Sequence, residues 1–249
     1  MESTPDSALP DAVPAAGASV EARTVERPRT VPYWHTFALI VVLAVLSHGG
    51  KAPHGSHVRL YLATIVYEWL FTAYIWWGIS RAGMKMRELI GGRWQSVEDF
   101  LLDVALSIGV WIGALILIAV AAIAMGMQHT ANVDEVSKQI GFLAPQSGWE
   151  IALWLCLSAT AGFCEEVLFR GYFQMQFTRL LCNRWLALAV VSILFGLGHG
   201  YEGAQRMVLI ALLGFAFGIA SIARKSLRPA MMAHTLQDAI SGILLRALR

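Results

Sequence analysis

Positions 161–170 of this 249-residue chain carry three ionisable residues, Glu165, Glu166 and Arg170, within an otherwise apolar stretch. An ionisable residue at the centre of a membrane helix costs about 2.5–3.5 kcal/mol on insertion scales, so this grouping indicates a function. In a helix, Glu166 and Arg170 lie on one face with the acid preceding the base, which favours an ion pair. Glu165 is rotated by about 100° and has no local partner. The pattern predicts a free carboxylate, suited to act as a general base, beside a fixed ion pair.

Two further polar positions interrupt apolar stretches. His199 ends a short apolar segment behind two glycines, which would let backbone or substrate approach closely. His234 and Asp238 are four positions apart, so both would lie on one face of the last helix. A single histidine on an apolar helix is more often structural, but four such groups on three helices are costly unless they converge. We therefore predict that Glu165, His199, His234 and Asp238 meet in one site.

Converging histidine and carboxylate side chains suit two kinds of hydrolytic chemistry. A divalent metal such as zinc could hold a water in an open coordination position. Alternatively, Glu165 and His199 could polarise a water directly, while His234 and Asp238 stabilise the oxyanion. The sequence contains neither HExxH nor GxSxG, which excludes a zincin arrangement and a serine nucleophile elbow. Both remaining alternatives hydrolyse an amide or an ester with an activated water.

The composition determines the setting of these groups. The chain is 57% hydrophobic and 14% charged, with a mean hydropathy of +0.57, which is typical of a polytopic membrane protein. At about 20 residues per span, we expect an all-α membrane helical bundle of about seven transmembrane helices, in a range of about six to eight. The net charge of +2 and the lack of a basic run argue against nucleic acid as a partner. The three cysteines fall in or beside apolar segments, which argues against a disulfide framework.

The chain divides into three parts. Residues 1–32 are rich in Pro, Ala, Ser, Thr and Glu, and predict a disordered tail. Residues 33–148 predict three transmembrane helices, and residues 149–249 predict a catalytic helical domain that carries the polar motifs. Glu68, in the second expected helix, is an intramembrane acid that we expect to face the interior with a hydroxyl or amide partner. The helix before His199 is short, so we expect it to end inside a water-filled cavity that opens toward the cytoplasm.

The distribution of Lys and Arg predicts the orientation. In a seven-helix arrangement with the N-terminus inside, the cytoplasmic segments hold about twice as many Lys and Arg as the outer segments. The 1–32 tail is therefore predicted to be cytoplasmic. No removable signal peptide is evident at the N-terminus.

The three polar motifs, in this order, resemble those of a known family of intramembrane proteases. This is the CPBP family, also called Abi or CAAX-protease-like, which includes the Ras-converting prenyl-protein endopeptidases. The similarity covers roughly residues 149–248. The motifs that carry it are Glu165-Glu166-x-x-x-Arg170, Phe195-x-x-x-His199 and His234-x-x-x-Asp238.

The resemblance implies a role for each residue. Glu165 would activate the water together with His199, and Glu166 with Arg170 would hold the site together. His234 and the residue at position 238 would stabilise the oxyanion. In a metal-dependent version, that is, a metalloprotease, Glu165, His199 and His234 would be the ligands. The resemblance also implies an integral protein of a bacterial inner or plasma membrane.

The chain departs from the prenyl-protease pattern at one position. That branch of the family has Asn where this chain has Asp238. An ionised Asp cannot donate a hydrogen bond to an oxyanion. Asp238 must therefore be protonated, orient His234 or bind a metal.

The combined prediction is an intramembrane endopeptidase. Its substrate would be a membrane-tethered peptide or protein in the lipid bilayer, cleaved in CAAX-like processing or peptide maturation. A bacteriocin self-immunity protein or a catalytically silent membrane scaffold is one alternative. A proton-coupled transporter is another, because buried charges can form a proton relay. Transporters often carry interrupted helices in both halves, whereas the polar residues here cluster in the C-terminal hundred residues, which disfavours that reading.

Overall fold

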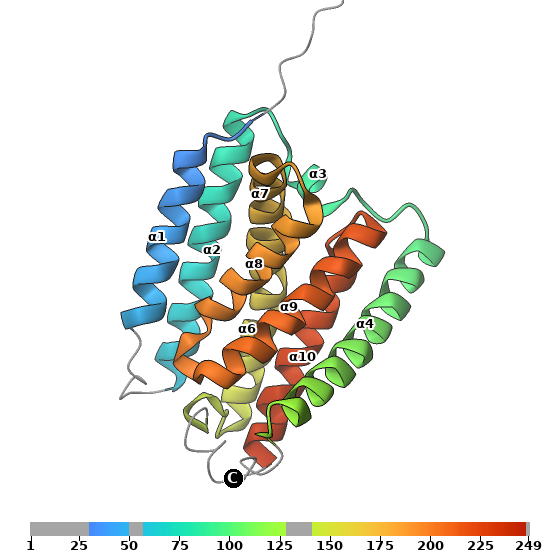
Figure 1. Ribbon diagram of the computed structural model, residues 1–249. Helices are drawn as coiled ribbons and strands as arrows, with labels where there is room; N and C mark the ends of the chain where they lie inside the picture. The colour runs from blue at the N-terminus through green and yellow to red at the C-terminus, as the bar shows by residue number, and fades with distance from the viewer. Residues whose placement is uncertain (1–29, 50–56, 128–140, 248–249) are drawn as a thin grey trace, which may run out of the picture.

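The computed structural model describes residues 30–49, 57–127 and 141–247, and these residues form helices and their connections without a strand (Figure 1). The all-α prediction is confirmed for this part of the chain. Most of the predicted 1–32 tail lies outside the described residues. The helices are α1 (Tyr33–Gly49), α2 (His57–Arg81), α3 (Met86–Ile90), α4 (Val97–Ala124), α6 (Gly148–Glu166), the π-helix η3 (Val167–Phe173), α7 (Gln174–Leu181), α8 (Arg184–Gly198), α9 (Ala204–Arg224) and α10 (Arg228–Ala247), with 3₁₀ turns η2 (Gly141–Leu143) and η4 (Gly200–Glu202).

Three helices in the described ranges are long and apolar enough to cross a membrane. They are α4, the continuous helix Gly148–Leu181 formed by α6, η3 and α7, and α9. Two shorter apolar helices, Tyr33–Leu46 and Arg184–Gly198, add to them. The expected number of about seven transmembrane helices stays a prediction.

The outer surface of the bundle is apolar. Only 11% of the most apolar window of α4 is buried in the protein. Ile112, Ile116, Val120 and Ile123 of that helix are all exposed. A surface of this kind is stable against lipid tails and not against water, so the protein is an integral membrane protein.

The continuous helix from α6 to α7 lies at the centre of the bundle (Figure 1). α2 packs against one side of α6 and α10 packs against another, while α8 packs on α7 and α9. α4 lies at one edge, against α9 and α10, and α1 lies at the opposite edge. Residues far apart in the sequence therefore meet around the C-terminal half of α6.

Polar capping residues determine where three of these helices begin. The side chains of Ser96, Ser147 and Asn183 each accept a hydrogen bond from a backbone N–H in the first turn of α4, α6 and α8. Such N-caps satisfy N–H groups that have no partner within the helix. They fix the start of α6, and with it the position of the acidic pair at its end.

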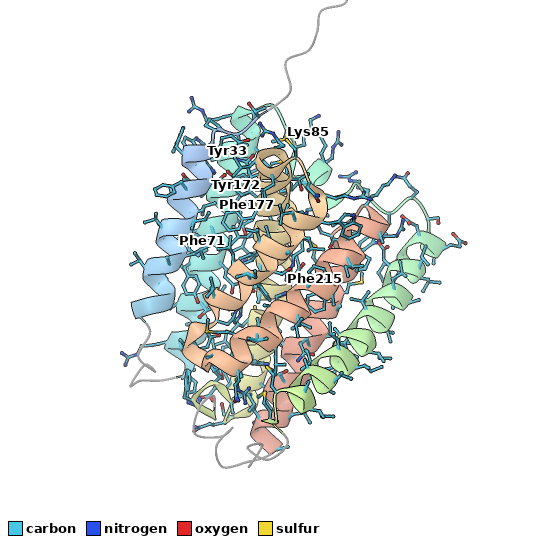
Figure 2. The ribbon with its side chains drawn as sticks, viewed as in Figure 1. Tyr33, Phe71, Lys85, Tyr172, Phe177 and Phe215 are labelled. Carbon is cyan, nitrogen blue, oxygen red and sulfur yellow. The ribbon has the colours of Figure 1, made fainter. Side chains whose placement is uncertain are left out.

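A polar network joins α1 to the central helix. The side chain of Tyr172 in η3 is labelled in Figure 2. Its hydroxyl lies 2.8 Å from His35 Nδ1 and 2.9 Å from Thr36 Oγ1, both in α1. Gln176 Nε2 donates to Thr36 Oγ1 over 2.7 Å. All four side chains are buried, so their hydrogen bonds fix the position of α1 against η3 and α7.

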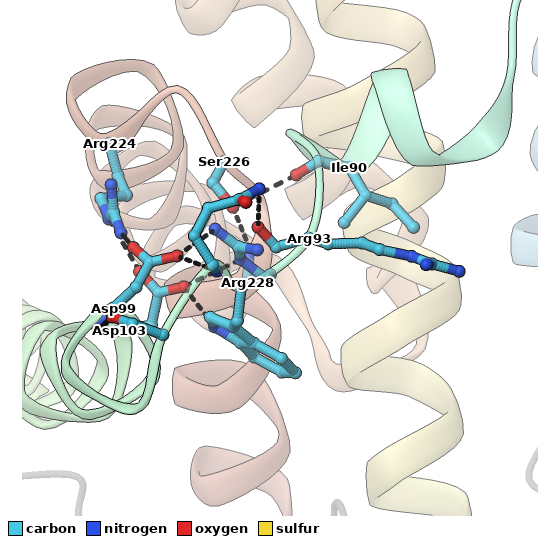
Figure 3. Close-up of polar contacts among 10 residues, drawn as sticks. Ile90, Arg93, Asp99, Asp103, Arg224, Ser226 and Arg228 are labelled. Carbon is cyan, nitrogen blue, oxygen red and sulfur yellow. Dashed lines mark hydrogen bonds and ion pairs between the residues drawn. The ribbon is translucent and has the colours of Figure 1, made fainter.

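A cluster of charged side chains fixes α4 against the connection between α9 and α10 (Figure 3). Asp103 is completely buried and accepts from Trp94 Nε1 over 2.8 Å. Its other neighbours are Arg224 Nε at 2.7 Å and Arg228 Nε at 2.8 Å, and Asp99 pairs with both arginines. Two acids and two bases balance in charge, which makes burial of Asp103 tolerable.

Candidate active site

The predicted ion pair between Glu166 and Arg170 is present in the structure. Arg170 Nη1 donates to Glu166 Oε1 over 2.9 Å, and the two side chains are 1% and 0% exposed. The backbone between them is not the α-helix that the spacing predicted, because η3 is a π-helix beginning directly after Glu166. Wide turns of this kind are frequent at functional sites.

Arg170 joins η3 to α8 and α9. Its Nε donates to the carbonyl oxygen of Gly214 over 3.3 Å, and its guanidinium lies 4.1 Å from the ring centre of Phe195. A Cβ atom at position 214 would collide with Arg170 Nη2 and lie 2.8 Å from the Phe195 ring. Glycine at 214 therefore lets α9 approach the arginine closely.

His234 of α10 lies between three carboxyl groups. Its Nδ1 is 2.9 Å from Oε1 of Glu166, the oxygen that also accepts from Arg170. Its Nε2 is 3.5 Å from Asp238 Oδ2 and 3.9 Å from Glu165 Oε2. The imidazole is thus held from behind by the ion pair and presents Nε2 to the other two acids.

His199 follows the last residue of α8, as the sequence predicted. Its Nδ1 is 2.9 Å from the carbonyl oxygen of Phe195, which can only accept, so Nδ1 carries a proton. In a neutral imidazole the lone pair then belongs to Nε2. The ring of Phe195 packs against the rings of both His199 and His234.

One cavity of about 600 Å³ brings the predicted residues together. Glu165, His199, His234 and Asp238 all line it, although they come from α6, α8 and α10. Glu165 is 20% exposed there, whereas Glu166 and Arg170 are buried behind the wall. α8 is 15 residues long and ends at this cavity, in agreement with the short helix expected from the sequence.

The residues in the described ranges do not form a metal-binding group. No three His, Cys, Asp or Glu side chains among them are arranged so that they could hold a metal ion. Of the three possible ligands, Glu165 and His234 face each other, but the Nδ1 of His199 is engaged with a backbone carbonyl. The zinc alternative stays a prediction.

The sequence did not predict that Glu68 of α2 belongs to the site. The structure buries it to 6% exposure on the wall of the same cavity. Among the described residues its Oε2 has no hydrogen-bond partner, so the expected hydroxyl or amide is not found at this oxygen. Charges of Glu165, His234 and Asp238 act on its carboxyl group instead. The only signal in the sequence was a single acid in an apolar helix.

Comparison with known proteins gives one match. Residues 147–240 match the model of a family described as Rce1-like, type II CAAX prenyl endopeptidase. The search of curated proteins and the search of solved structures found no match. The matched segment begins just before α6 and includes all six site residues expected from the motifs, while α2 with Glu68 lies outside it. The resemblance inferred from those motifs is confirmed.

Proposed function

We propose that the chain hydrolyses a peptide bond of a membrane-tethered substrate, because residues 147–240 match the Rce1-like CAAX prenyl endopeptidase family. The reaction uses a water activated by Glu165 and His199. The observation that carries this proposal is the single cavity lined by Glu165, His199, His234 and Asp238 inside the matched segment.

The exposure of Glu165 and the hydrogen bonding of His199 support their role in activating the water. The Glu165 side chain is 20% exposed on the cavity wall, so its carboxylate is available to accept a proton. His199 has its Nε2 lone pair left over to accept a hydrogen bond from the same water. Proton transfer to Glu165 yields a hydroxide equivalent that attacks the substrate carbonyl carbon. Glu165 then returns the proton to the leaving amine.

The oxyanion that forms needs hydrogen-bond donors on the opposite side. His234 Nε2 points toward Asp238 and Glu165, and as an imidazolium it donates from both ring nitrogens. Asp238 donates when its carboxyl group is protonated, which gives it the capacity of the Asn found in the prenyl-protease branch. Loss of one such donor costs about 10²–10³ in kcat in enzymes of this kind. Glu166 and Arg170 serve by fixing His234.

The location of the cavity inside a membrane-embedded bundle suggests which kind of substrate can reach it. The cavity lies within a bundle whose outer surface is apolar, so a substrate carrying its own lipid or membrane helix reaches it from the bilayer. We infer that a peptide tethered near its cleavage site is preferred. A soluble peptide of the same sequence would lack that concentration at the membrane.

The test uses purified protein in lipid vesicles with a peptide ending in a prenylated Cys-a-a-X sequence. The same peptide without the lipid is the substrate control. Mass spectrometry should show cleavage of the lipidated peptide by the wild type, unaffected by a chelator, and none by His199→Ala. Cys182→Ser, a change of an exposed side chain outside the cavity lining, should cleave like the wild type. Equal cleavage by His199→Ala would contradict the proposal, as would a wild type inert toward every tethered peptide.

A further inference from the structure

We propose that Glu68 is a positioning residue: its protonated carboxyl group donates a hydrogen bond to Glu165 and thereby holds the base in place. This inference rests on the proposed function, because it assigns Glu165 as the base. It adds a residue from α2, which lies outside the segment matched by the family model.

Glu68 and Glu165 line the same cavity. α2 packs directly on α6, and the two side chains reach the cavity from these two helices. Of the charged groups that act on the Glu68 carboxyl, Glu165 has the largest effect, ahead of His234 and Asp238. Glu68 itself is 6% exposed, and its Oε2 accepts no hydrogen bond from any side chain in the part of the chain that the structure describes.

The site holds more acidic than basic side chains. Four carboxyl groups, from Glu68, Glu165, Glu166 and Asp238, share this site with Arg170 and with two imidazoles, His199 and His234, so the acids outnumber the groups that can be cationic. Arg170 is already paired with Glu166. Carboxylates that share a buried site cannot all be ionised, and a shared proton is the usual solution. At least one acid beside Glu165 must therefore carry a proton.

Glu68 and Glu165 each have one carboxyl oxygen without a hydrogen-bond partner among the described residues. These two atoms, Glu68 Oε2 and Glu165 Oε2, are both buried. An unsatisfied buried acceptor costs about 1–3 kcal/mol. One proton between the two groups satisfies both, whereas two bare carboxylates would repel each other. Asp238 has His234 Nε2 as a neighbour at 3.5 Å, whereas Glu68 Oε2 has no partner among the described residues. Glu68 is therefore the acid that can donate its proton to Glu165.

A donor on one oxygen of Glu165 has a consequence for the reaction. It fixes the rotation of the carboxylate and leaves the other oxygen to accept the proton of the water.

The matched pair of variants is Glu68→Gln and Glu68→Met, which have similar volumes. Gln is always neutral and its amide donates as the protonated acid does, whereas Met fills the space and donates nothing. We expect Glu68→Gln to keep kcat within about threefold of the wild type. Glu68→Met should lose about 10²-fold in kcat through misplacement of the base, with KM nearly unchanged. A Glu68→Met variant as fast as the wild type would overturn the proposal. So would a Glu68→Gln variant as slow as Glu68→Met, since Glu68 would then act as an ionised group.

A second measurement does not depend on catalysis. Infrared spectroscopy of the full chain in vesicles detects the carbonyl stretch of a protonated carboxyl group, and Glu68→Gln should remove one such band. If the wild type cleaves nothing but the band is present and disappears, the proposed function fails and the shared proton stands. If Glu68→Gln leaves the carboxyl bands unchanged, Glu68 carries no proton and the inference fails, whatever the activity.

Discussion

At the residue scale, His234 is the side chain on which the site depends. Its Nδ1 faces Glu166, whose carboxylate is fixed by Arg170, and its Nε2 faces Asp238 and Glu165. The buried ion pair thus orients the imidazole without lining the cavity itself. This explains why an apolar helix carries two consecutive acids: one is available for chemistry and the other positions a partner.

Asp238 is expected to act as a protonated donor. Asp238→Asn supplies a neutral donor in the same place, so kcat should stay within about tenfold of the wild type. Asp238→Ala removes the donor and should lower kcat by about 10²–10³-fold. Cleavage rates of both variants in vesicles check this. An inactive Asp238→Asn beside an active Asp238→Ala would show that position 238 works in some other way.

At the element scale, the approach of α6 to α10 determines whether the acids reach His234. Gly162 lies three residues before Glu165, and a Cβ there would lie 2.8 Å from the carbonyl oxygen of Met231 and 2.9 Å from the backbone nitrogen of Thr235. These are backbone atoms beside His234, so they cannot rotate away. The two helices meet at a distance that only glycine permits.

Gly162→Ala should therefore separate α6 from α10 and lower both kcat and stability. Overpacking of this kind costs about 1–3 kcal/mol, and a 1 Å displacement of the site costs about 10²-fold in rate. Thermal unfolding and cleavage rates measure the two effects.

The matched control is Gly113→Ala in α4, where a Cβ would meet nothing within 4 Å. It should be neutral or slightly stabilising, because Ala is the better helix former. Equal behaviour of the two variants would contradict a tight contact at Gly162.

The helices that carry the site were predictable from the sequence, and parts of the site were not. Apolar runs and spacing located the helices that bear Glu165, His199 and His234, and the i,i+4 rule predicted the ion pair. The π-helical backbone of η3 has no such signal, because the spacing of Glu166 and Arg170 equally fits an α-helix. The sequence identified Glu68 as an intramembrane acid but did not predict that it lines the same cavity as Glu165. That contact depends on how α2 and α6 are rotated about their axes relative to each other.

At the scale of the whole molecule, the cluster of Asp99, Asp103, Arg224 and Arg228 holds the outermost helix on the bundle (Figure 3). Residues 97–124 carry most of their apolar surface outward, so only one stripe of α4, around Ala114, packs on α9 and α10. The paired charges supply part of what apolar packing does elsewhere. The partners are about 121 residues apart in the sequence, so spacing alone gave no indication of them.

Asp103→Asn should destabilise the fold by about 3–5 kcal/mol, because it leaves buried arginine charge uncompensated. Unfolding of the purified protein in detergent measures the change. Glu98→Gln, an exposed acid of the same helix, is the control and should change stability by less than about 0.5 kcal/mol. A loss no larger than that of the control would mean that the cluster does not hold α4.

The orientation in the membrane stays a proposal that can be tested directly. The end of α2, the start of α8 and the α9–α10 connection, all with basic residues, lie at one end of the bundle (Figure 1). We propose a seven-helix topology with this end, and the N-terminus, in the cytoplasm. The cavity extends from Glu165 toward the other end, near the starts of α2 and α9 (Figure 1), so in this orientation it does not open toward the cytoplasm as the sequence suggested. In a cysteine-free background, an impermeant thiol reagent applied to intact cells should label Gln205→Cys and not Lys85→Cys. The reverse pattern would contradict this orientation.

The central claim is that the carboxylate of Glu165 activates the water. Its most direct test compares kcat of the wild type, Glu165→Gln and Cys164→Ser on one tethered peptide, with thermal unfolding to show that all three are folded. We predict a loss of about 10²–10⁴-fold for Glu165→Gln, as expected for removal of a general base, and little change for the neighbouring Cys164→Ser. Cleavage by Glu165→Gln at the wild-type rate would contradict the account.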